Sequence, residues 1–462
     1  MAGRGLLVAG TASDAGKTLV VAGLCRILAR RGLRVAPFKA QNMSNNSMVC
    51  LDGAEIGRAQ YLQAIAARVV PEAAMNPVLL KPGTDRRAHV VVNGKPFGTL
   101  EAGEYATGRK QLAEAAFTAY RALTERFDLV VCEGAGSPAE INLRAGDYVN
   151  MGLAQEFGLP VVVVGDIDRG GVLAAFYGTW ALLDDDDRSL LTAFVVNKFR
   201  GDEAVLQPGL DEITRRTGLP VLGVLPWLPD VWLDGEDAFV VGRWRPERGV
   251  AADAVAGSAA GGQLTVAVAD LPRVSNATDV DALACEPGVD VVVTADASRC
   301  ATADLLVLPG TRATIDDLMW LQDSGIAAVA RQRAVAGMPV LGICGGYQML
   351  ARRIEDAVEG GGHQVVDGLG LLPIFVRFAE TKVLARPSGT WRGLPVEGYE
   401  IHHGVAEPDG DSIAAEAFPG GCAVGAVFGT MWHGTLEVDD FRRAWLAEVA
   451  QHPNIELRVG WM

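Results

Sequence analysis

The chain has 462 residues, of which 49% are hydrophobic and 21% are charged. This composition excludes a disordered or fibrous protein and provides enough apolar material for two or three domains, each with its own core. A formal net charge of −15 argues against a protein that binds a nucleic-acid backbone, because that interaction requires clustered Lys and Arg.

The first half of the chain alternates short Val-rich runs with helical segments, a pattern typical of a parallel sheet covered by helices. Because the apolar runs are continuous, we expect strands that are buried on both faces. The predicted strands are residues 6–9, 34–38, 90–92, 129–132, 161–164, 194–196 and 221–224, and the predicted helices are residues 17–30, 57–69, 108–126 and 172–183.

A glycine-rich loop joins the first strand to the first helix, with the sequence Gly10-Thr11-Ala12-Ser13-Asp14-Ala15-Gly16-Lys17-Thr18. Its backbone can wrap a polyphosphate, while Lys17 supplies a positive charge and the Thr18 hydroxyl can bind Mg²⁺. Five residues separate the two outer glycines, one more than in the standard phosphate-binding motif. We predict an ATP site here, the alternative being an ordinary strand-to-helix turn.

Polar residues follow several of the next strands. Glu133, at the end of the fourth predicted main-sheet strand, can hold Mg²⁺ or its waters, and Asp52 is a second candidate; the alternatives are a strand-end cap and a turn residue. The run from Gln41 to Asn46 is too rich in amides for a core segment, so we expect it to bind a ligand, or else to form a capped loop. Candidates for further ligand contacts are Asp166, Asp168, Arg169 and Lys198.

A stretch of small residues from about 245 to 263 predicts a linker between two domains. We place the domains at residues 1–245 and 263–462, with the linker at 246–262. The second domain has predicted strands at 265–269, 291–294, 305–308 and 340–343, further strands near 398–403 and 427–433, and helices at 314–336 and 439–449. The expected fold class is α/β, with two domains that each contain a mainly parallel sheet flanked by helices.

Cys344 lies on a glycine-rich turn between a buried strand and a helix, in the sequence Gly342-Ile343-Cys344-Gly345-Gly346. Such a turn pushes the side chain outward, and the following helix N-terminus favours the thiolate. The neighbouring glycines avoid Cβ clashes and leave backbone N–H groups for an oxyanion hole. We therefore predict a nucleophile, the alternative being a buried structural cysteine.

A thiolate that attacks an amide needs a base that also protonates the leaving ammonia. His433, which we expect at the end of a strand, is our candidate, and His402 and His403 are its rivals. Glu400 is a candidate to orient a histidine, although an alternating strand face explains it equally well.

The seven cysteines have no C-x-x-C spacing and an odd total, which favours reduced thiols and a cytoplasmic location. The N-terminus lacks a signal pattern, and no apolar run reaches the length of a membrane span. We therefore expect a soluble protein with no membrane or nucleic-acid partner, and leave an oligomer open.

Several long segments resemble the cobyric acid synthase family, the glutamine-hydrolysing enzymes of adenosylcobalamin synthesis. They are residues 36–47, 55–60, 75–82, 133–143, 165–171, 197–202, 272–279, 308–310, 398–402 and 433–434, together with the Cys344 turn. The resemblance covers essentially the whole chain outside the linker, and its strings are long and specific.

The resemblance implies an amidotransferase with a dethiobiotin-synthetase-like P-loop domain and a class I glutamine amidotransferase domain. Its members convert the b, d, e and g carboxylates of adenosylcobyrinic acid a,c-diamide to carboxamides, with one ATP and one glutamine for each step. It maps the nucleophile onto Cys344 and the base onto His433. We also expect Asn197 and Lys198 to contribute to the nucleotide site.

This sequence departs from many class I glutaminases, which carry Glu two residues after the histidine. Here Gly434 and Thr435 follow His433. The corrinoid amidases resemble this sequence in lacking that Glu, so the resemblance implies a Cys–His pair and leaves open which group orients the histidine. His403 also stands where the family pattern leads us to expect another residue.

Three other functions remain open. Cobyrinic acid a,c-diamide synthase shares both domain types. A P-loop switch ATPase of the chromosome-partition kind would carry an inactive amidotransferase-like domain as a binding module. A peptidoglycan or other ligase could use the same glutaminase, although its substrate motifs are not evident in this sequence.

Overall fold

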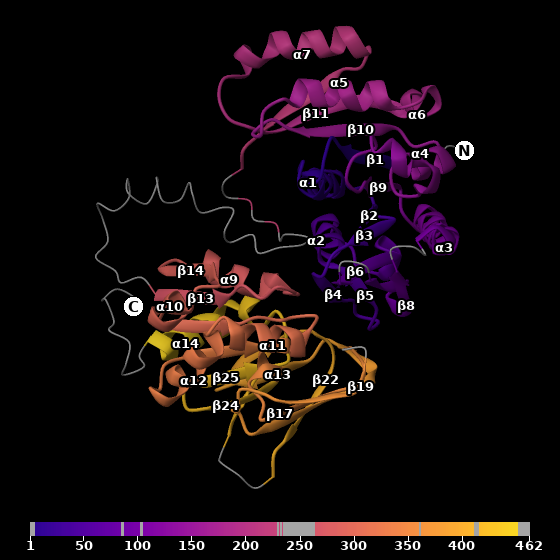
Figure 1. The fold of residues 1–462 in the computed structure, drawn as a ribbon. Helices are drawn as coiled ribbons and strands as arrows, with labels where there is room; N and C mark the ends of the chain where they lie inside the picture. The colour runs from indigo at the N-terminus through magenta and orange to yellow at the C-terminus, as the bar shows by residue number, and fades with distance from the viewer. Residues whose placement is uncertain are drawn as a thin grey trace. The chain divides into compact units, whose positions relative to one another are not determined.

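The computed structural model describes residues 5–84, 87–101, 105–228, 231, 233, 264–359, 362–410 and 415–450. The chain divides into two compact units, labelled by element in Figure 1. The first consists of Met1–Ser44 and Cys50–Leu233, and the second of Asn45–Val49 and Asp234–Met462. The predicted linker, residues 246–262, lies outside the described residues.

Six parallel strands form the main sheet of the first unit. They are β1 (Gly5–Gly10), β2 (Val35–Phe38), β9 (Leu129–Glu133), β10 (Val161–Asp166), β11 (Leu191–Phe199) and β12 (Val221–Pro226). Their order is β12-β11-β10-β1-β9-β2, and every neighbouring pair is parallel. The carboxyl ends of all six strands therefore meet at one edge, which carries the predicted phosphate loop and Glu133, whereas Asp52 lies in the turn between two short strands outside this sheet.

Helices cover both faces of this sheet. They are α1 (Lys17–Arg30), α2 (Arg58–Ala67), α3 (Tyr105–Arg126), α4 (Met151–Phe157), α5 (Val172–Leu182), α6 (Asp185–Leu190) and α7 (Glu203–Thr217), with 3₁₀ turns η1 (Ala73–Met75) and η2 (Ile141–Gly146). Val21 of α1 and Ala67 of α2 belong to the same buried apolar cluster as Val8 of β1. Side chains alternate along a strand, so Gly5 faces the opposite side of the sheet from Val8. A Cβ on Gly5 would lie 2.2 Å from the hydroxyl of Tyr120, which shows that α3 covers this face.

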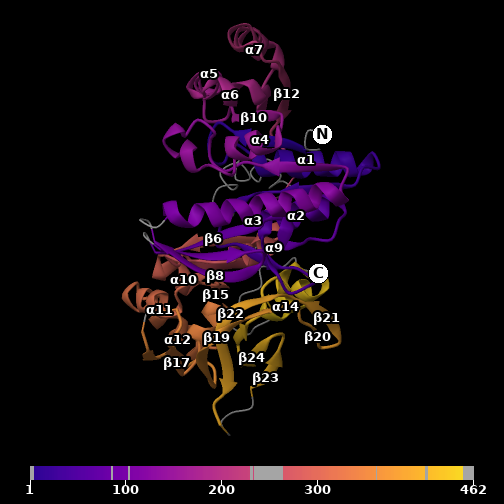
Figure 2. The ribbon, with the colours of Figure 1, turned by 90° about the vertical axis from the view of Figure 1, so that its right-hand side faces the viewer.

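A smaller sheet in the first unit corrects one prediction. It contains β3 (Gln41–Met43), β6 (Val78–Thr84), β7 (Arg87–Val92) and β8 (Lys95–Glu101) in the order β3-β6-β7-β8, and a short strand β5 (Glu55–Gly57) precedes α2. Residues 90–92, which we predicted in the parallel sheet, lie in β7, antiparallel to β6 and β8. Figure 2 shows α3 as the long helix that packs against β6 and β8.

The second unit has a seven-stranded sheet. Its strands are β13 (Leu264–Ala269), β14 (Val289–Thr294), β15 (Leu305–Leu308), β16 (Val340–Ile343), β23 (Glu416–Phe418), β24 (Gly421–Val424) and β25 (Val427–Thr430). Their order is β14-β13-β15-β16-β25-β24-β23. The first five strands are parallel to one another, β24 is antiparallel to β25, and β23 is antiparallel to β24. The expected α/β class with mainly parallel sheets is confirmed for both units.

The remaining elements of this unit surround that sheet. The helical ones are η3 (Ala277–Val280), α9 (Asp281–Cys285), α10 (Ala297–Thr302), α11 (Thr314–Asp323), α12 (Ile326–Val335), α13 (Gly345–Met349), η4 (Thr435–Glu437) and α14 (Asp439–Ala450). The strands are β4 (Ser47–Val49), β17 (Arg353–Asp356), β18 (Gln364–Asp367), β19 (Ile374–Ala385), β20 (Ser388–Trp391), β21 (Leu394–Glu397) and β22 (Glu400–Pro408). The single helix predicted over 314–336 is wrong, because Gly325 adopts φ +80° between α11 and α12.

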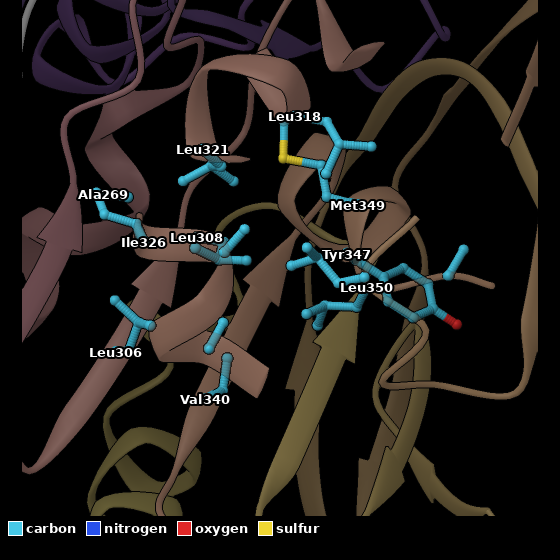
Figure 3. Packing of buried hydrophobic residues seen from close by; sticks show 14 of the residues in the cluster. Ala269, Leu306, Leu308, Leu318, Leu321, Ile326, Val340, Tyr347, Met349 and Leu350 are labelled. Carbon is cyan, nitrogen blue, oxygen red and sulfur yellow. The ribbon is translucent and has the colours of Figure 1, made fainter. Parts of the chain in front are cut away.

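Two apolar layers hold this sheet. Figure 3 shows one of them, in which Leu318 and Met349 come from helices and Leu308 from the sheet. On the other layer, the ring of Trp445 in α14 meets Phe428 edge-on, with ring centroids 5.6 Å apart. Residues of β15, β16 and β25 are packed into both layers, so the ends of these strands are held in place relative to one another. Within the described part of the chain, no helix combines the length and apolar character needed to cross a membrane.

Candidate functional site

The glycine-rich loop lies between β1 and α1, as predicted. Gly16 has φ +95°, and a Cβ on it would lie 2.0 Å from Nδ2 of Asn197, so the loop requires glycine there. Asn197, at the end of β11, donates from Nδ2 to the carbonyl of Ala15 at 3.0 Å, and the Thr11 N–H donates to the Val164 carbonyl at 2.9 Å. Two neighbouring strands therefore fix the loop's shape.

Lys17 and Thr18 lie beside Glu133. The Lys17 ammonium donates to the carbonyls of Ala12 at 3.0 Å and Gly136 at 3.2 Å, so it bridges this loop and the one after β9. The Thr18 hydroxyl donates to Oε1 of Glu133 at 3.0 Å. The structure thus brings together the three residues that we predicted for phosphate and Mg²⁺ binding.

Glu133 is completely buried and has two partners that the sequence did not indicate. Lys39, at the end of β2, donates from Nζ to Oε1 at 3.0 Å, and Gln63 of α2 donates to Oε2. Burial alone would raise the pKa of Glu133, but the Lys39 charge, the hydrogen bond from Gln63 and the Lys17 charge outweigh it and hold this pKa below its usual value. Glu133 is therefore a carboxylate held ionised inside the unit.

A second polar cluster lies at the ends of β10 and β11. Lys198 donates to the carbonyl of Asp14 and to the carboxylate of Asp166, each at 2.8 Å. Arg169 lies 3.5 Å from the Asp14 carboxylate and 3.7 Å from that of Asp166. These predicted residues therefore meet beside the phosphate loop, whereas Asp168 pairs with Arg200 at 3.4 Å.

Asp52 and the amide-rich run differ from expectation. Asp52 is exposed, and its Oδ1 accepts from the Ala54 N–H at 3.0 Å, which is the bond of a turn residue. The expectation that the run from Gln41 to Asn46 avoids the interior is wrong, because Asn42 and Asn46 are buried. Asn42 donates to Oε1 of Gln60 at 3.2 Å and Oδ1 of Asn46 accepts from the Ala277 N–H, so internal hydrogen bonds are made by these two amides, whereas the buried Oδ1 of Asn45 has no hydrogen-bond partner among the described residues.

Cys344 occupies a strained turn directly after β16. Its φ of +50° and ψ of −107° are rare for a residue with a side chain, and such strain is concentrated at functional sites. The Cys344 N–H donates to the Thr430 carbonyl at 2.7 Å, which ties the turn to β25. The strained strand-to-helix turn predicted from the flanking glycines is present, but the Cys344 side chain is only 5% exposed and lies in a buried cluster of this unit, so the expected outward placement is not observed.

The glycines beside Cys344 allow α13 to lie against the main sheet. A Cβ on Gly346 would lie 1.9 Å from the carbonyl oxygen of Leu308, and a Cβ on Gly345 would lie 2.5 Å from Cγ2 of Thr311. These contacts are too close for any side chain. The expected removal of Cβ clashes is therefore a requirement of packing.

His433 lies three residues beyond the end of β25 and is completely buried. Its Nδ1 is 2.6 Å from Oδ2 of Asp279, and the other oxygen of Asp279 accepts from the Gly434 N–H at 2.8 Å. The ring of Tyr399 stacks on the imidazole, with centroids 5.3 Å apart. Asp279 therefore orients His433, and the pair implied by the family resemblance gains a third member.

The charges around His433 favour its protonated form. Burial alone would lower the pKa of the imidazole, but the Asp279 and Cys344 charges raise it to about 10. Nε2 of His433 makes no hydrogen bond of ordinary geometry, although Cys344 is near enough to contribute to this shift. An imidazole held at Nδ1 with Nε2 available beside a thiol has the arrangement of a general base.

The rival histidines have other surroundings. His402 lies in β22, with Nε2 3.6 Å from Glu400, and both residues line a cavity of about 550 Å³ that includes Tyr347 but neither Cys344 nor His433. Glu400 therefore does not orient His433. His403 bonds through Nδ1 to the Ala379 carbonyl at 3.0 Å, a structural contact that accounts for its presence.

Sequence reasoning missed Asp279, Lys39 and Gln63 as members of these sites. Each lies inside a segment that supported the family resemblance or next to one, but its partner is distant in sequence: Asp279 is 154 positions from His433. Only the juxtaposition of η3 with the residues after β25 identifies it.

Comparisons with known proteins agree with this arrangement. Residues 6–237 match the CobQ/CobB/MinD/ParA nucleotide binding domain family, and residues 265–441 match the CobB/CobQ-like glutamine amidotransferase domain family. The chain is 65% identical over 450 residues to cobyric acid synthase of Cutibacterium acnes. The aligned region covers 97% of this chain and 91% of that protein.

Two further relatives carry the same name. Cobyric acid synthase of Mycolicibacterium vanbaalenii is 57% identical over 454 residues, covering 97% of this chain and 89% of the relative. That of Mycobacterium tuberculosis strain H37Ra is 59% identical over 453 residues, covering 96% and 88%. Identity of this degree over almost the full length, with both domain families matched, means that this chain belongs to the cobyric acid synthase family of glutamine amidotransferase-domain ligases.

Proposed function

We propose that this enzyme of cobalamin biosynthesis uses ATP and glutamine to convert the b, d, e and g carboxylates of adenosylcobyrinic acid a,c-diamide to carboxamides, forming adenosylcobyric acid. Family membership supports the corrinoid substrate. The observation that carries the nitrogen chemistry is the Asp279–His433 contact of 2.6 Å beside Cys344. An inactive binding module would have no need to keep a buried acid and base aligned behind a strained cysteine.

In the glutaminase half-reaction, Sγ of Cys344 attacks the carboxamide carbon of glutamine, and His433 holds the thiol proton at Nε2. As the C–N bond breaks, His433 delivers that proton to the nitrogen, which leaves as ammonia. Water then cleaves the thioester to glutamate and restores the thiol. Asp279 keeps the imidazole in the tautomer and orientation that both transfers require.

In the ligase half-reaction, a carboxylate oxygen of the corrinoid attacks the γ-phosphorus of ATP, so ADP leaves and an acyl phosphate forms. Ammonia attacks that carbonyl carbon, and phosphate leaves as the amide forms. Lys17 neutralises charge on the transferring group, and the backbone N–H groups of the loop hold the other phosphates. Asn197 and Lys198 support the loop through Ala15 and Asp14.

The Thr18 hydroxyl oxygen fits Mg²⁺ and lies 3.0 Å from the Glu133 carboxylate. The oxygens of Glu133 already accept from Lys39 and Gln63, so Glu133 would hold the ion through its water ligands. Within the described ranges, no three His, Cys, Asp or Glu side chains gather to hold a metal. Phosphate oxygens and water would therefore complete the ligands, as is usual for this ion. Bound there, Mg²⁺ would offset the negative charge of the triphosphate.

The test is to incubate the enzyme with Mg-ATP, glutamine and either adenosylcobyrinic acid a,c-diamide or the parent cobyrinic acid, and to measure product masses. Each exchange of OH for NH₂ lowers the mass by about one unit. We expect up to four exchanges on the diamide. Two exchanges on the parent acid, with none on the diamide, would identify a cobyrinic acid a,c-diamide synthase instead.

A further inference from the structure

The short segment Asn45–Val49 belongs to the second unit, although it interrupts the sequence of the first. Its centre is buried: Asn46 is 2% exposed and Ser47 is 0% exposed. Burial of an amide side chain is costly unless its polar atoms are bonded. The partners of this segment therefore indicate why it is placed there.

Two asparagines join this segment to the turn before η3 in a reciprocal manner. Oδ1 of Asn46 accepts from the Ala277 N–H at 3.1 Å, and Oδ1 of Asn276 accepts from the Ser47 N–H at 3.0 Å. Both bonds are buried, and each side chain fixes the backbone of the opposite segment. The two bonds form one small network, in which loss of either amide leaves a buried N–H without that acceptor.

The turn that these bonds hold carries the acid of the glutaminase site. Asn276 has φ +51°, a left-handed conformation that Asn tolerates better than most residues. The Asp279 N–H donates to the Asn276 carbonyl at 3.2 Å, and the Asp279 carboxylate reaches His433. A single 3₁₀ turn therefore separates the held backbone from the carboxylate.

We propose that Asn46 is a positioning residue for glutamine hydrolysis, because it holds the Asn276–Asp279 turn and thereby keeps Asp279 aligned on His433. This inference rests on the proposed glutaminase role of Cys344 and His433. Asn46 follows β3 closely in sequence, so the alignment of the glutaminase site depends on a segment encoded within the nucleotide-binding half of the chain.

The test uses the full chain with Asn46→Ala, and with Leu51→Ala as a control, because Leu51 is nearby in sequence and 72% exposed. Loss of a group that orients a catalytic partner lowers rates about 10- to 100-fold, by analogy with supporting residues of metal sites. We expect kcat for glutamine hydrolysis to fall by about tenfold, with KM changed by less than about twofold. Product formation from ammonia should persist, and Leu51→Ala should match the parent.

Two further measurements separate positioning from a general structural role. Asn276→Gly keeps the left-handed turn but removes the other bond, and should lower kcat in the same way. If Asn46 acts through Asp279, then Asn46→Ala should cost little more in an Asp279→Asn background. The pH above which glutamine hydrolysis declines should also be lower in Asn46→Ala. A looser contact with Asp279 destabilises the protonated form of the His433 imidazole, which lies beside Cys344 and Tyr399, and so lowers its pKa.

Unchanged kcat in Asn46→Ala would overturn the inference, as would an equal loss in the Asp279→Asn background or an equal loss of glutamine- and ammonia-driven activity. The failure of the proposed function has a different signature, since the parent enzyme would then release no ammonia from glutamine. Parallel assays of the parent and variants therefore distinguish the two failures.

Discussion

Each of the two candidate sites contains a buried carboxylate. Glu133 lies beside Lys17 and accepts a hydrogen bond from Thr18, and Asp279 contacts Nδ1 of His433. Burial opposes the charge of Glu133, while Lys39, Gln63 and Lys17 retain it. Burial likewise opposes the charge of the His433 imidazolium, while Asp279 and Cys344 favour it. The expected results of changing these acids follow from that balance.

Asp279→Asn should lower kcat for glutamine hydrolysis by about 10- to 10⁴-fold, because the imidazole loses the partner that fixes its tautomer. The pKa of His433, about 10 in the parent against 6.5 for a free imidazole, should fall in the variant. A pH profile of glutamine hydrolysis checks this prediction. A variant whose basic limb coincides with that of the parent would show that Asp279 does not act on His433.

The same contact predicts a pH-dependent stability. A raised pKa means that the protonated imidazole stabilises the fold fully below about pH 6.5, and that this contribution is lost as the pH rises through about 10. Urea unfolding of the parent and Asp279→Asn should therefore show a larger difference in the free energy of unfolding at pH 7 than above pH 10. Equal differences at both pH values would contradict the charge assignment.

Lys17→Ala should remove ATP-dependent amide formation with either nitrogen donor, by about 10²-fold or more, because Lys17 offsets charge on the transferring phosphoryl group. Glutamine hydrolysis without ATP should continue. Arg34→Ala is a suitable control, since Arg34 pairs with Asp128 at the surface. Loss of both activities in Lys17→Ala, with normal behaviour of the control, would argue against separate centres.

Functional residues within a local sequence motif could be predicted from the sequence, whereas those defined by contacts with distant segments could not. Lys17 and Cys344 stand in strand–turn–helix contexts whose physics is contained in a few neighbouring residues. Asp279 has no such local signal. Asp52 has an ambiguous signal, because an aspartate that bonds its own turn resembles a metal ligand in sequence, and the structure shows the turn bond.

At the scale of elements, strand positions were predictable and sheet membership was less so. The buried strands of the parallel sheets are continuous apolar runs, but residues 90–92 look the same and belong to an antiparallel sheet. Pairing is decided by tertiary contacts, which local composition does not contain. Likewise, the apolar pattern of α11 continues into α12, and only the conformation of Gly325 separates them.

The close packing of α13 on β15 gives a prediction about this element. Gly346→Ala would place a methyl group 1.9 Å from the Leu308 carbonyl oxygen, so the helix must move. We expect a loss of roughly 1–3 kcal/mol in the free energy of unfolding and reduced glutamine hydrolysis. Gly23→Ala, in helix α1, is the matched control, because a Cβ there meets nothing within 4 Å. Equal stability of both variants in urea would contradict this packing.

For the whole molecule, we propose that each of the two units of the chain carries one of two reactions. None of the seven cysteines, all of which lie in the described part of the chain, forms a disulfide bond, so the proposed nucleophile Cys344 is one thiol among several and is distinguished by its turn. Cys25, for example, is buried. Its burial, with a smaller contribution from the Glu133 charge, raises the pKa of its thiol to about 12, which makes it unreactive. Substitution of Cys344 should therefore separate the two reactions cleanly.

The most direct test is to compare Cys344→Ser with the parent, using glutamine or ammonium as the nitrogen donor and measuring the mass of the corrinoid product with Mg-ATP present. We expect the variant to form no amide from glutamine but to make the same successive amides as the parent from ammonium. Amide formation from glutamine by Cys344→Ser at the parent rate would contradict the assignment of the nucleophile and, with it, the division of labour proposed for this enzyme.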